Sequence, residues 1–305
     1  MIKTEIQQIL IHLIAINKQI NNIKMKSFFF FTSIFIFLLI SCGLNEVKYF
    51  VDKGNVYKNK GQFELAINMY SSAIEIDPKN EEIYYLRATC YDSIGKLNLA
   101  IADYTSLIKI NPKFQYGYGM RAYLYSKLDK YDFAIIDYTS EIKNYPNGYD
   151  AVYNRGYMYY LRGDFDLALQ DFARAIEIDP NDFFAYRSRG DLYLAQRKEK
   201  LAIEDYTSAI NLNPDDYVSY NFRGICYRDK NNDLALSDFN ASTRINPNYE
   251  GAYINRGILY YLLGEKELAI RDLKKTADLG FEYGSKYLKE YYNIDYPVGK
   301  IKEEK

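Results

Sequence analysis

The chain contains few of the residue types that carry most catalytic and metal chemistry. Its 305 residues include one histidine, His12, three cysteines and no tryptophan. Without histidine beyond residue 12, the chain lacks the usual general acid-base group, the usual activator of serine or cysteine nucleophiles, and the commonest metal ligand. No glycine-rich phosphate loop is present either. We therefore expect no enzyme activity, with no catalytic residue, metal or cofactor.

An excess of charge of one sign is also missing. Lysine and arginine number 39 against 40 aspartates and glutamates, and residues 1–41 hold four of the lysines and one of the glutamates. Without that segment the formal charge is −4. A weakly acidic chain with dispersed charge has no basic stripe for a phosphate backbone, so nucleic acid is not an expected partner.

Proline is scarce but strictly periodic. Of the seven prolines, five are spaced by 34 residues and a sixth follows after 33: Pro78, Pro112, Pro146, Pro180, Pro214 and Pro247. A fixed period of this length is typical of stacked supersecondary units, none of which can bury its apolar face alone.

Each period repeats the same pattern of small and large residues. Small residues form a first row at Gly54, Ala88, Ala122, Gly156, Gly190, Gly224 and Gly257, and a second row at Ala66, Ala100, Ala134, Ala168, Ala202, Ala235 and Ala269. A tyrosine follows three residues after each member of the first row, and a large residue four after each alanine, which is helical spacing. Glycine-containing turns join the two predicted helices, and Asp-Pro or Asn-Pro closes most units.

This pattern resembles the tetratricopeptide repeat. The resemblance is strongest over residues 149–180, where only Val152 departs from the large aromatic residue that the family places there; the matching residues are Tyr153, Arg155, Gly156, Tyr159, Gly163, Phe165, Ala168, Phe172, Ala175 and Pro180. It implies an all-α fold, a right-handed α-solenoid of about seven helix-turn-helix repeats over residues 47–280. Residues 281–293 are predicted to form a capping helix, and residues 294–305 a tail.

Charged residues recur at fixed positions of the repeats. An arginine precedes the small residue of six first helices, and an aspartate precedes the large residue of six second helices: Arg87, Arg121, Arg155, Arg189, Arg223 and Arg256, and Asp103, Asp137, Asp171, Asp205, Asp238 and Asp272. Their regularity predicts an ion-pair ladder within or between repeats, leaving open whether Asp103 pairs with Arg87 or Arg121. Cys90 and Cys226 lie four repeats apart, too far for a disulfide, and are expected to be buried fillers.

The amino-terminal region carries a second signal. Lys24 and Lys26 precede an apolar run over residues 27–40, which is shorter than the roughly 20 residues of a membrane span. A positive flank and a short apolar core indicate an export signal, and the sequence that ends at Cys42 resembles the bacterial lipobox, whose cysteine is acylated. An uncleaved signal anchor and a buried helix are the alternatives. We predict a leader over residues 1–41, with Met25 as a possible true start, and an anchor linker over residues 42–46.

The two resemblances together imply a role. The first helices of tetratricopeptide repeats line a concave groove, and the positions that match it here carry Tyr85, Tyr116, Tyr123, Tyr153, Tyr157, Tyr160, Phe184 and Tyr261. We expect a lipid-anchored adaptor of the bacterial cell envelope, in the outer membrane or facing the periplasm, that binds a protein or peptide in this groove; a small molecule is not the expected ligand. The alternative is glycan or peptidoglycan binding through the tyrosines. A carboxylate pair such as Asp150 with Asp191 would be needed for an enzyme, and no motif supports one.

Overall fold

A computed structural model describes Lys18 and residues 45–299 of the chain. It divides into two compact units, on either side of the Leu124–Tyr125 bond. Every regular element in the described part is a helix, which confirms the predicted all-α fold. Cys42 and the predicted export signal lie outside the described residues.

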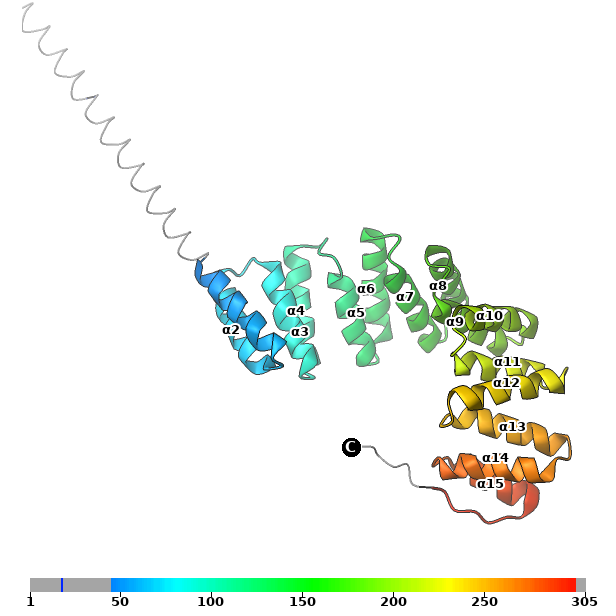
Figure 1. The fold of residues 1–305 in the computed structure, drawn as a ribbon. Coiled ribbons are helices and arrows are strands. Elements are labelled where there is room, and N and C mark those ends of the chain that lie inside the picture. The colour runs from blue at the N-terminus through cyan, green and yellow to red at the C-terminus, as the bar shows by residue number, and fades with distance from the viewer. Residues whose placement is uncertain (1–17, 19–44, 300–305) are drawn as a thin grey trace, which may run out of the picture. The chain divides into compact units, whose positions relative to one another are not determined.

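The helices follow one another in pairs along the chain (Figure 1). In the first unit, helical residues 45–59 precede α2 (Phe63–Ile76), α3 (Glu81–Ser93) and α4 (Leu97–Ile110). Helix α5 (Gly117–Lys127) crosses the unit boundary. The second unit continues with α6 (Tyr131–Asn144), α7 (Tyr149–Arg162), α8 (Phe165–Ile178), α9 (Phe183–Ala195), α10 (Glu199–Leu212), α11 (Tyr217–Tyr227), α12 (Asn232–Ile245), α13 (Glu250–Leu262), α14 (Lys266–Asp278) and α15 (Glu282–Tyr292).

Local chemistry explains where the helices end. Gly163 follows α7 with a φ of 91°, a left-handed conformation that glycine adopts without a Cβ penalty. The second helices end before proline, because that ring disfavours helical backbone in the preceding residue. In five of these closures the side-chain oxygen of the preceding Asp or Asn also accepts a hydrogen bond from the backbone N–H two residues later, at Asp77, Asn111, Asp179, Asn213 and Asn246.

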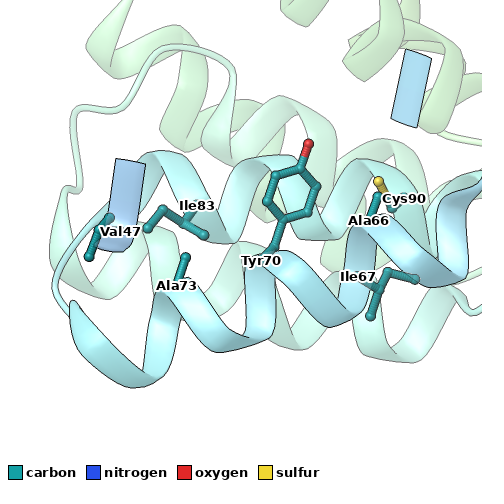
Figure 2. Packing of buried hydrophobic residues seen from close by; sticks show 7 residues of the cluster. All are labelled: Val47, Ala66, Ile67, Tyr70, Ala73, Ile83 and Cys90. Atoms are coloured by element: carbon teal, nitrogen blue, oxygen red, sulfur yellow. The ribbon is translucent and has the colours of Figure 1, made fainter. Parts of the chain in front are cut away.

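The core of each repeat is built from the small rows and the large residue of the second helix. In the first unit Tyr70 lies in the middle of a cluster with Val47, Ala66, Ile67, Ala73, Ile83 and Cys90 (Figure 2). A Cβ on Gly54 would lie 2.5 Å from the Tyr70 ring, so only glycine permits this close approach. The predicted role of the small residues in helix packing is confirmed.

The two cysteines of the described part are free and buried, as predicted. Burial raises the pKa of Cys90, and it raises the pKa of Cys226 to about 11. Both side chains therefore remain protonated thiols at neutral pH, which suits apolar fillers and not nucleophiles.

The arginine-aspartate ladder pairs within repeats. Arg87 donates from Nε and Nη2 to the two carboxylate oxygens of Asp103, at 2.8 and 2.7 Å, so the question that the sequence left open is answered in favour of Arg87. The same two-point pairing joins Arg155 to Asp171, Arg189 to Asp205, Arg223 to Asp238 and Arg256 to Asp272.

The remaining guanidinium nitrogen of most of these arginines reaches back to the previous repeat. Nη1 of Arg87 donates to Ser71, 16 residues earlier, and Arg155, Arg223 and Arg256 bond in the same way to Thr139, Thr207 and Asn240. Arg189 is the exception, because Ala173 occupies the corresponding position and offers no acceptor. The ladder therefore ties the two helices of one repeat together and, at most junctions, ties that repeat to its predecessor.

Candidate functional site

The first helices line the inner side of the second unit. In addition to the contacts between successive helices, α9 packs against α11 and α11 against α13, which are first helices of neighbouring repeats. Among the described helices, neither α10 with α12 nor α12 with α14 makes a comparable contact. The first helices α9, α11 and α13 therefore contact one another along one side of the stack, which we call its inner side.

The eight groove residues predicted from the sequence divide by exposure. Six are exposed: Tyr116, Tyr123, Tyr157, Tyr160, Phe184 and Tyr261. The other two, Tyr85 and Tyr153, are partly buried and pack against hydrophobic core clusters. Tyr85 lies beside Tyr104 and Phe114, and Tyr153 lies beside Phe172, with its hydroxyl 3.1 Å from the Ser188 hydroxyl. Part of the predicted set therefore serves packing.

The exposed members are distributed over both units: Tyr116 and Tyr123 belong to the first unit, and Tyr157, Tyr160, Phe184 and Tyr261 to the second. At the carboxyl-terminal end Tyr261 is stacked on Tyr291 of α15, with ring centroids 4.1 Å apart, which leaves one of its ring faces covered. The aromatic residues best placed to meet a ligand in the second unit are therefore those on α7 and α9.

An aromatic patch lies where α7 turns into α8. Tyr157 and Tyr160 are stacked with centroids 6.1 Å apart, and Phe165, at the start of α8, lies 6.0 Å from Tyr160. All three side chains are about 40% exposed. Phe165 was quoted for the family resemblance but was not among the predicted groove residues, because those were taken from first helices and Phe165 begins a second helix. We call Tyr157, Tyr160 and Phe165 the aromatic patch.

Next to Phe184 on α9 lies an ion pair that connects two repeats. The Arg187 guanidinium lies 4.9 Å from the Phe184 ring centre, and its Nη1 donates to Asp216 at 2.8 Å. Asp216 is buried and also accepts a hydrogen bond from the Ser219 hydroxyl at 2.5 Å. Arg187 was not predicted as a site residue; the signal was available, since it is an arginine outside the periodic ladder.

Asp191 lies one helical turn after Arg187, on the same helix. Its Oδ1 accepts a hydrogen bond from the Tyr206 hydroxyl at 2.7 Å, so the inner face of α9 is tied to the buried ring of α10. Burial raises the pKa of Asp191 to about 6, although the Tyr206 hydrogen bond and the charge of Arg187 favour the ionised form. Burial also raises the pKa of Tyr206, so that its hydroxyl remains a proton donor.

A further polar chain continues along α11 and α13. Asn221 is buried, and its Oδ1 accepts a hydrogen bond from the side-chain amide of Asn255 at 3.0 Å. Its own amide lies 3.5 Å from the hydroxyl of Tyr249, whose pKa burial raises to about 12. This unit thus has an aromatic patch on α7 and α8 and a series of polar side chains along α9, α11 and α13. Sequence reasoning missed Asn221 and Asn255, because asparagine is common throughout this chain.

Other kinds of site are not apparent in the described part. No group of three or more His, Cys, Asp or Glu side chains in residues 45–299 could hold a metal ion. None of the helices in the same part is long and apolar enough to cross a bilayer. Asp150 and Asp191, the pair considered for catalysis, share no hydrogen bond in the described part, and Asp150 is exposed.

Comparison with known families identifies the repeats. Models of the tetratricopeptide repeat match residues 54–93, 81–114, 149–182 and 185–216. These matches fall in both units and agree with the helix pairs, the small rows and the proline closures described above. The chain is a tetratricopeptide repeat protein. No curated protein matches it.

Solved structures share this fold at low identity. A tetratricopeptide repeat protein from Parabacteroides merdae is 24% identical, with 81% of this chain and 99% of that chain covered and a TM-score of 0.61. The carboxyl-terminal part of a repeat protein from Cytophaga hutchinsonii is 18% identical, covers 76% and 95%, and has a TM-score of 0.63. A chain of the Cut9–Hcn1 hetero-tetramer of the APC/C is 17% identical, with 76% of this chain and 46% of that chain covered and a TM-score of 0.59.

Proposed function

We propose that this protein is a non-enzymatic scaffold that binds a segment of a protein partner along the first-helix side of its second unit. The observation that carries the proposal is the aromatic patch of Tyr157, Tyr160 and Phe165, three exposed rings in contact on α7 and the start of α8. Tyrosine supplies a large contact area and a hydroxyl at low entropic cost, and it is enriched at interface positions that dominate binding.

The fold supports this role without specifying the partner. A stack of helix pairs provides an extended surface and uses its own charged ladder for internal pairing, so the ladder is not available to a ligand. Among the solved relatives, Cut9 is found in a hetero-tetramer with Hcn1. The proposal for the present chain is a protein or peptide ligand held by the exposed residues of α7 and α9.

The test is site-specific photocrosslinking in cells from position 157 of the full-length protein. We expect a reproducible crosslinked protein band, and a second one when the crosslinker stands at position 184. The band from position 184 should be strongly reduced when the double substitution Tyr157→Ala, Tyr160→Ala is present. Tyr283→Ala, which removes a more exposed tyrosine from α15, is the control and should leave the band unchanged. Capture that survives the double substitution, or retention of the protein by purified cell wall alone, would contradict the proposal, and the latter result would favour a glycan ligand.

We further propose that the protein is held at a membrane of the bacterial cell envelope by acyl chains on Cys42. The support is the sequence pattern at residues 24–42, which lies outside the described residues. Cys42 would stand three residues before Asn45, where the described repeats begin, so the repeats would be displayed close to the lipid surface. More than one acyl chain is needed for stable anchoring, since each buried methylene contributes about 0.8 kcal/mol.

A further inference from the structure

Asp191 is an unusual carboxylate among the aspartates of the second unit. It lies half-buried on α9, a first helix. Its one hydrogen bond from a side chain comes from the neutral hydroxyl of Tyr206, at 2.7 Å to Oδ1. A carboxylate can accept about four hydrogen bonds, so most of its accepting capacity, including all of Oδ2, is unused by other side chains of the described part.

No cation of the described part forms a salt bridge with Asp191. The nearest arginine along the helix, Arg187, gives its Nη1 to Asp216 at 2.8 Å. Arg189, on the same helix, is held by both oxygens of Asp205. Arg187 therefore has a carboxylate of its own, and the three side chains Arg187, Asp191 and Asp216 together carry one net negative charge.

The other repeats show that the fold does not need a charge at this position. In the first repeat the equivalent residue is Asn55, whose neutral oxygen accepts the hydrogen bond from Tyr70 at 2.8 Å. In the sixth repeat the residues equivalent to Asp191 and Tyr206 are both apolar: Ile225 packs in the cluster of Phe239. A neutral amide or an apolar pair satisfies the packing, so the negative charge at Asp191 serves no purpose that the repeat itself requires.

A half-buried carboxylate without a salt-bridge partner is unfavourable in the free protein, and such perturbed groups are concentrated at functional sites. We propose that Asp191 binds a cationic side chain, a lysine ammonium or an arginine guanidinium, of the segment that occupies the first-helix side of the second unit. The ligand cation would donate to the free Oδ2 and restore charge balance beside the Arg187–Asp216 pair. This inference rests on the proposed function and adds to it the charge of the group that is recognised.

The electrostatic neighbours of Asp191 suit a cation. Tyr249, at the start of α13, lies within electrostatic range of Asp191, and a tyrosine ring is a favourable neighbour for an alkylammonium or guanidinium group. Phe184 is already covered by the Arg187 guanidinium at 4.9 Å and is not free for this purpose. The expected contact of the ligand cation is therefore Asp191, and the exposed rings of α7 would bind apolar side chains of the same ligand.

The test uses the full-length protein and a library of acetylated, amidated decapeptides that are rich in apolar residues and carry one central lysine, glutamine or glutamate. For wild-type protein we expect the lysine members to bind about tenfold more tightly than their glutamine partners, the effect of one charge-assisted hydrogen bond in a partly desolvated site. Asp191→Asn should reduce this preference to less than twofold. Asp150→Asn, which removes an exposed charge from α7, is the matched control and should retain the preference.

The outcomes separate this inference from the proposed function. Binding without a lysine preference, or a preference that survives Asp191→Asn, overturns the role of Asp191 while the peptide-binding face stands. The failure of every peptide to bind contradicts both proposals. Unfolding of the Asn variant would not explain a lost preference, because the same substitution leaves a neutral acceptor for Tyr206, as Asn55 does for Tyr70, and its circular dichroism and melting curve are measured in parallel.

Discussion

At the scale of single residues, Asp191 shows how a binding position can reduce the stability of the fold that carries it. Burial raises the pKa of its carboxyl to about 6, well above the value of about 3.9 in unfolded chains. The folded protein therefore binds this proton more tightly than the unfolded chain does. The contribution of this group to stability is fully present below pH 4 and is lost as the pH rises through 6.

We accordingly predict that Asp191→Asn stabilises the protein at neutral pH. A difference of about two pKa units corresponds to roughly 3 kcal/mol, and partial solvent access reduces the expected gain to about 1–2 kcal/mol at pH 7.5. The gain should shrink to near zero at pH 4, where Asp191 is largely neutral in the folded state. Urea unfolding at both pH values measures this gain. The groups that act on the pKa of Asp191 are the neutral hydroxyl of Tyr206 on α10 and the charges of Arg187 on α9 and of Asp216.

A variant that is destabilised at pH 7.5 would contradict this account, since it would mean that the ionised carboxylate is well satisfied in the free protein. Asp205→Asn provides the contrast. Its carboxylate is buried and bound at two points by Arg189, so its neutralisation should destabilise the protein at the same pH.

At the scale of helices, the arginine ladder is the device that couples each pair to its neighbour. Thr207 illustrates the geometry: its hydroxyl donates to the Ile203 carbonyl oxygen at 2.7 Å and accepts from Nη1 of Arg223 at 3.0 Å. The threonine thus satisfies its own hydrogen-bonding capacity inside α10 while it joins α10 to α11. The junction between α8 and α9 lacks this bond because Ala173 stands at the threonine position.

This difference predicts two substitutions of opposite sign. Thr207→Ala should lower the free energy of unfolding by about 1 kcal/mol, because it removes a partner from a charged, partly buried donor. Ala173→Thr should raise it, by about 0.5 kcal/mol, because a new bond to Arg189 exceeds the lower helix propensity of threonine. Denaturant unfolding checks both, and hydrogen exchange in α8 and α9 localises the second effect.

Ala173→Ser has a hydroxyl of similar reach without the added methyl group and serves as the companion to Ala173→Thr. If both variants are less stable than wild type, the bond from Arg189 does not form and the ladder is not the coupling device at this junction.

The ladder positions themselves were predicted from the sequence, since six arginines and six aspartates recur in register. The hydrogen bond from each arginine to the previous repeat was not predicted, because Ser71, Thr139 and Asn240 are chemically different residues.

At the scale of the whole molecule, we propose that the repeats provide the binding surface and that the amino-terminal region anchors it to a membrane. The proposed anchor predicts that Cys42→Ser abolishes incorporation of an alkyne-labelled fatty acid and moves the protein from the membrane fraction to the soluble fraction. Loss of the acyl chains removes the buried methylenes that hold the protein to lipid. Labelling followed by fractionation and mass spectrometry of the amino-terminal peptide measures this.

Cys90→Ala is the control for this experiment. It removes a buried thiol from the core of the first unit and should leave the acyl label in place. A membrane-bound Cys42→Ser protein that keeps residues 1–41 would contradict lipid attachment and support the uncleaved signal anchor. A soluble wild-type protein would contradict both.

The repeat pattern alone predicted the helix pairs, the closures before proline and the close approaches at the small rows. Each of these depends on residues near one another in the chain or on a register that every repeat shares, so a 34-residue period is enough to reveal it. Tertiary structure decided which of several similar side chains pack in the core and which remain exposed. Tyr153 and Tyr157 lie one turn apart on α7, yet Tyr153 packs on Phe172 while Tyr157 is exposed.

The same distinction separates Asp191 from the ladder aspartates. All are aspartates on repeat helices, and composition cannot tell a paired carboxylate from an unpaired one. Asp205 meets Arg189 because the helices of one repeat cross with those side chains facing, whereas Asp191 faces the inner side of α9, where the nearby arginine is held by Asp216. Periodicity determined the architecture of this protein; the packing between repeats decided which side chains remain free to bind.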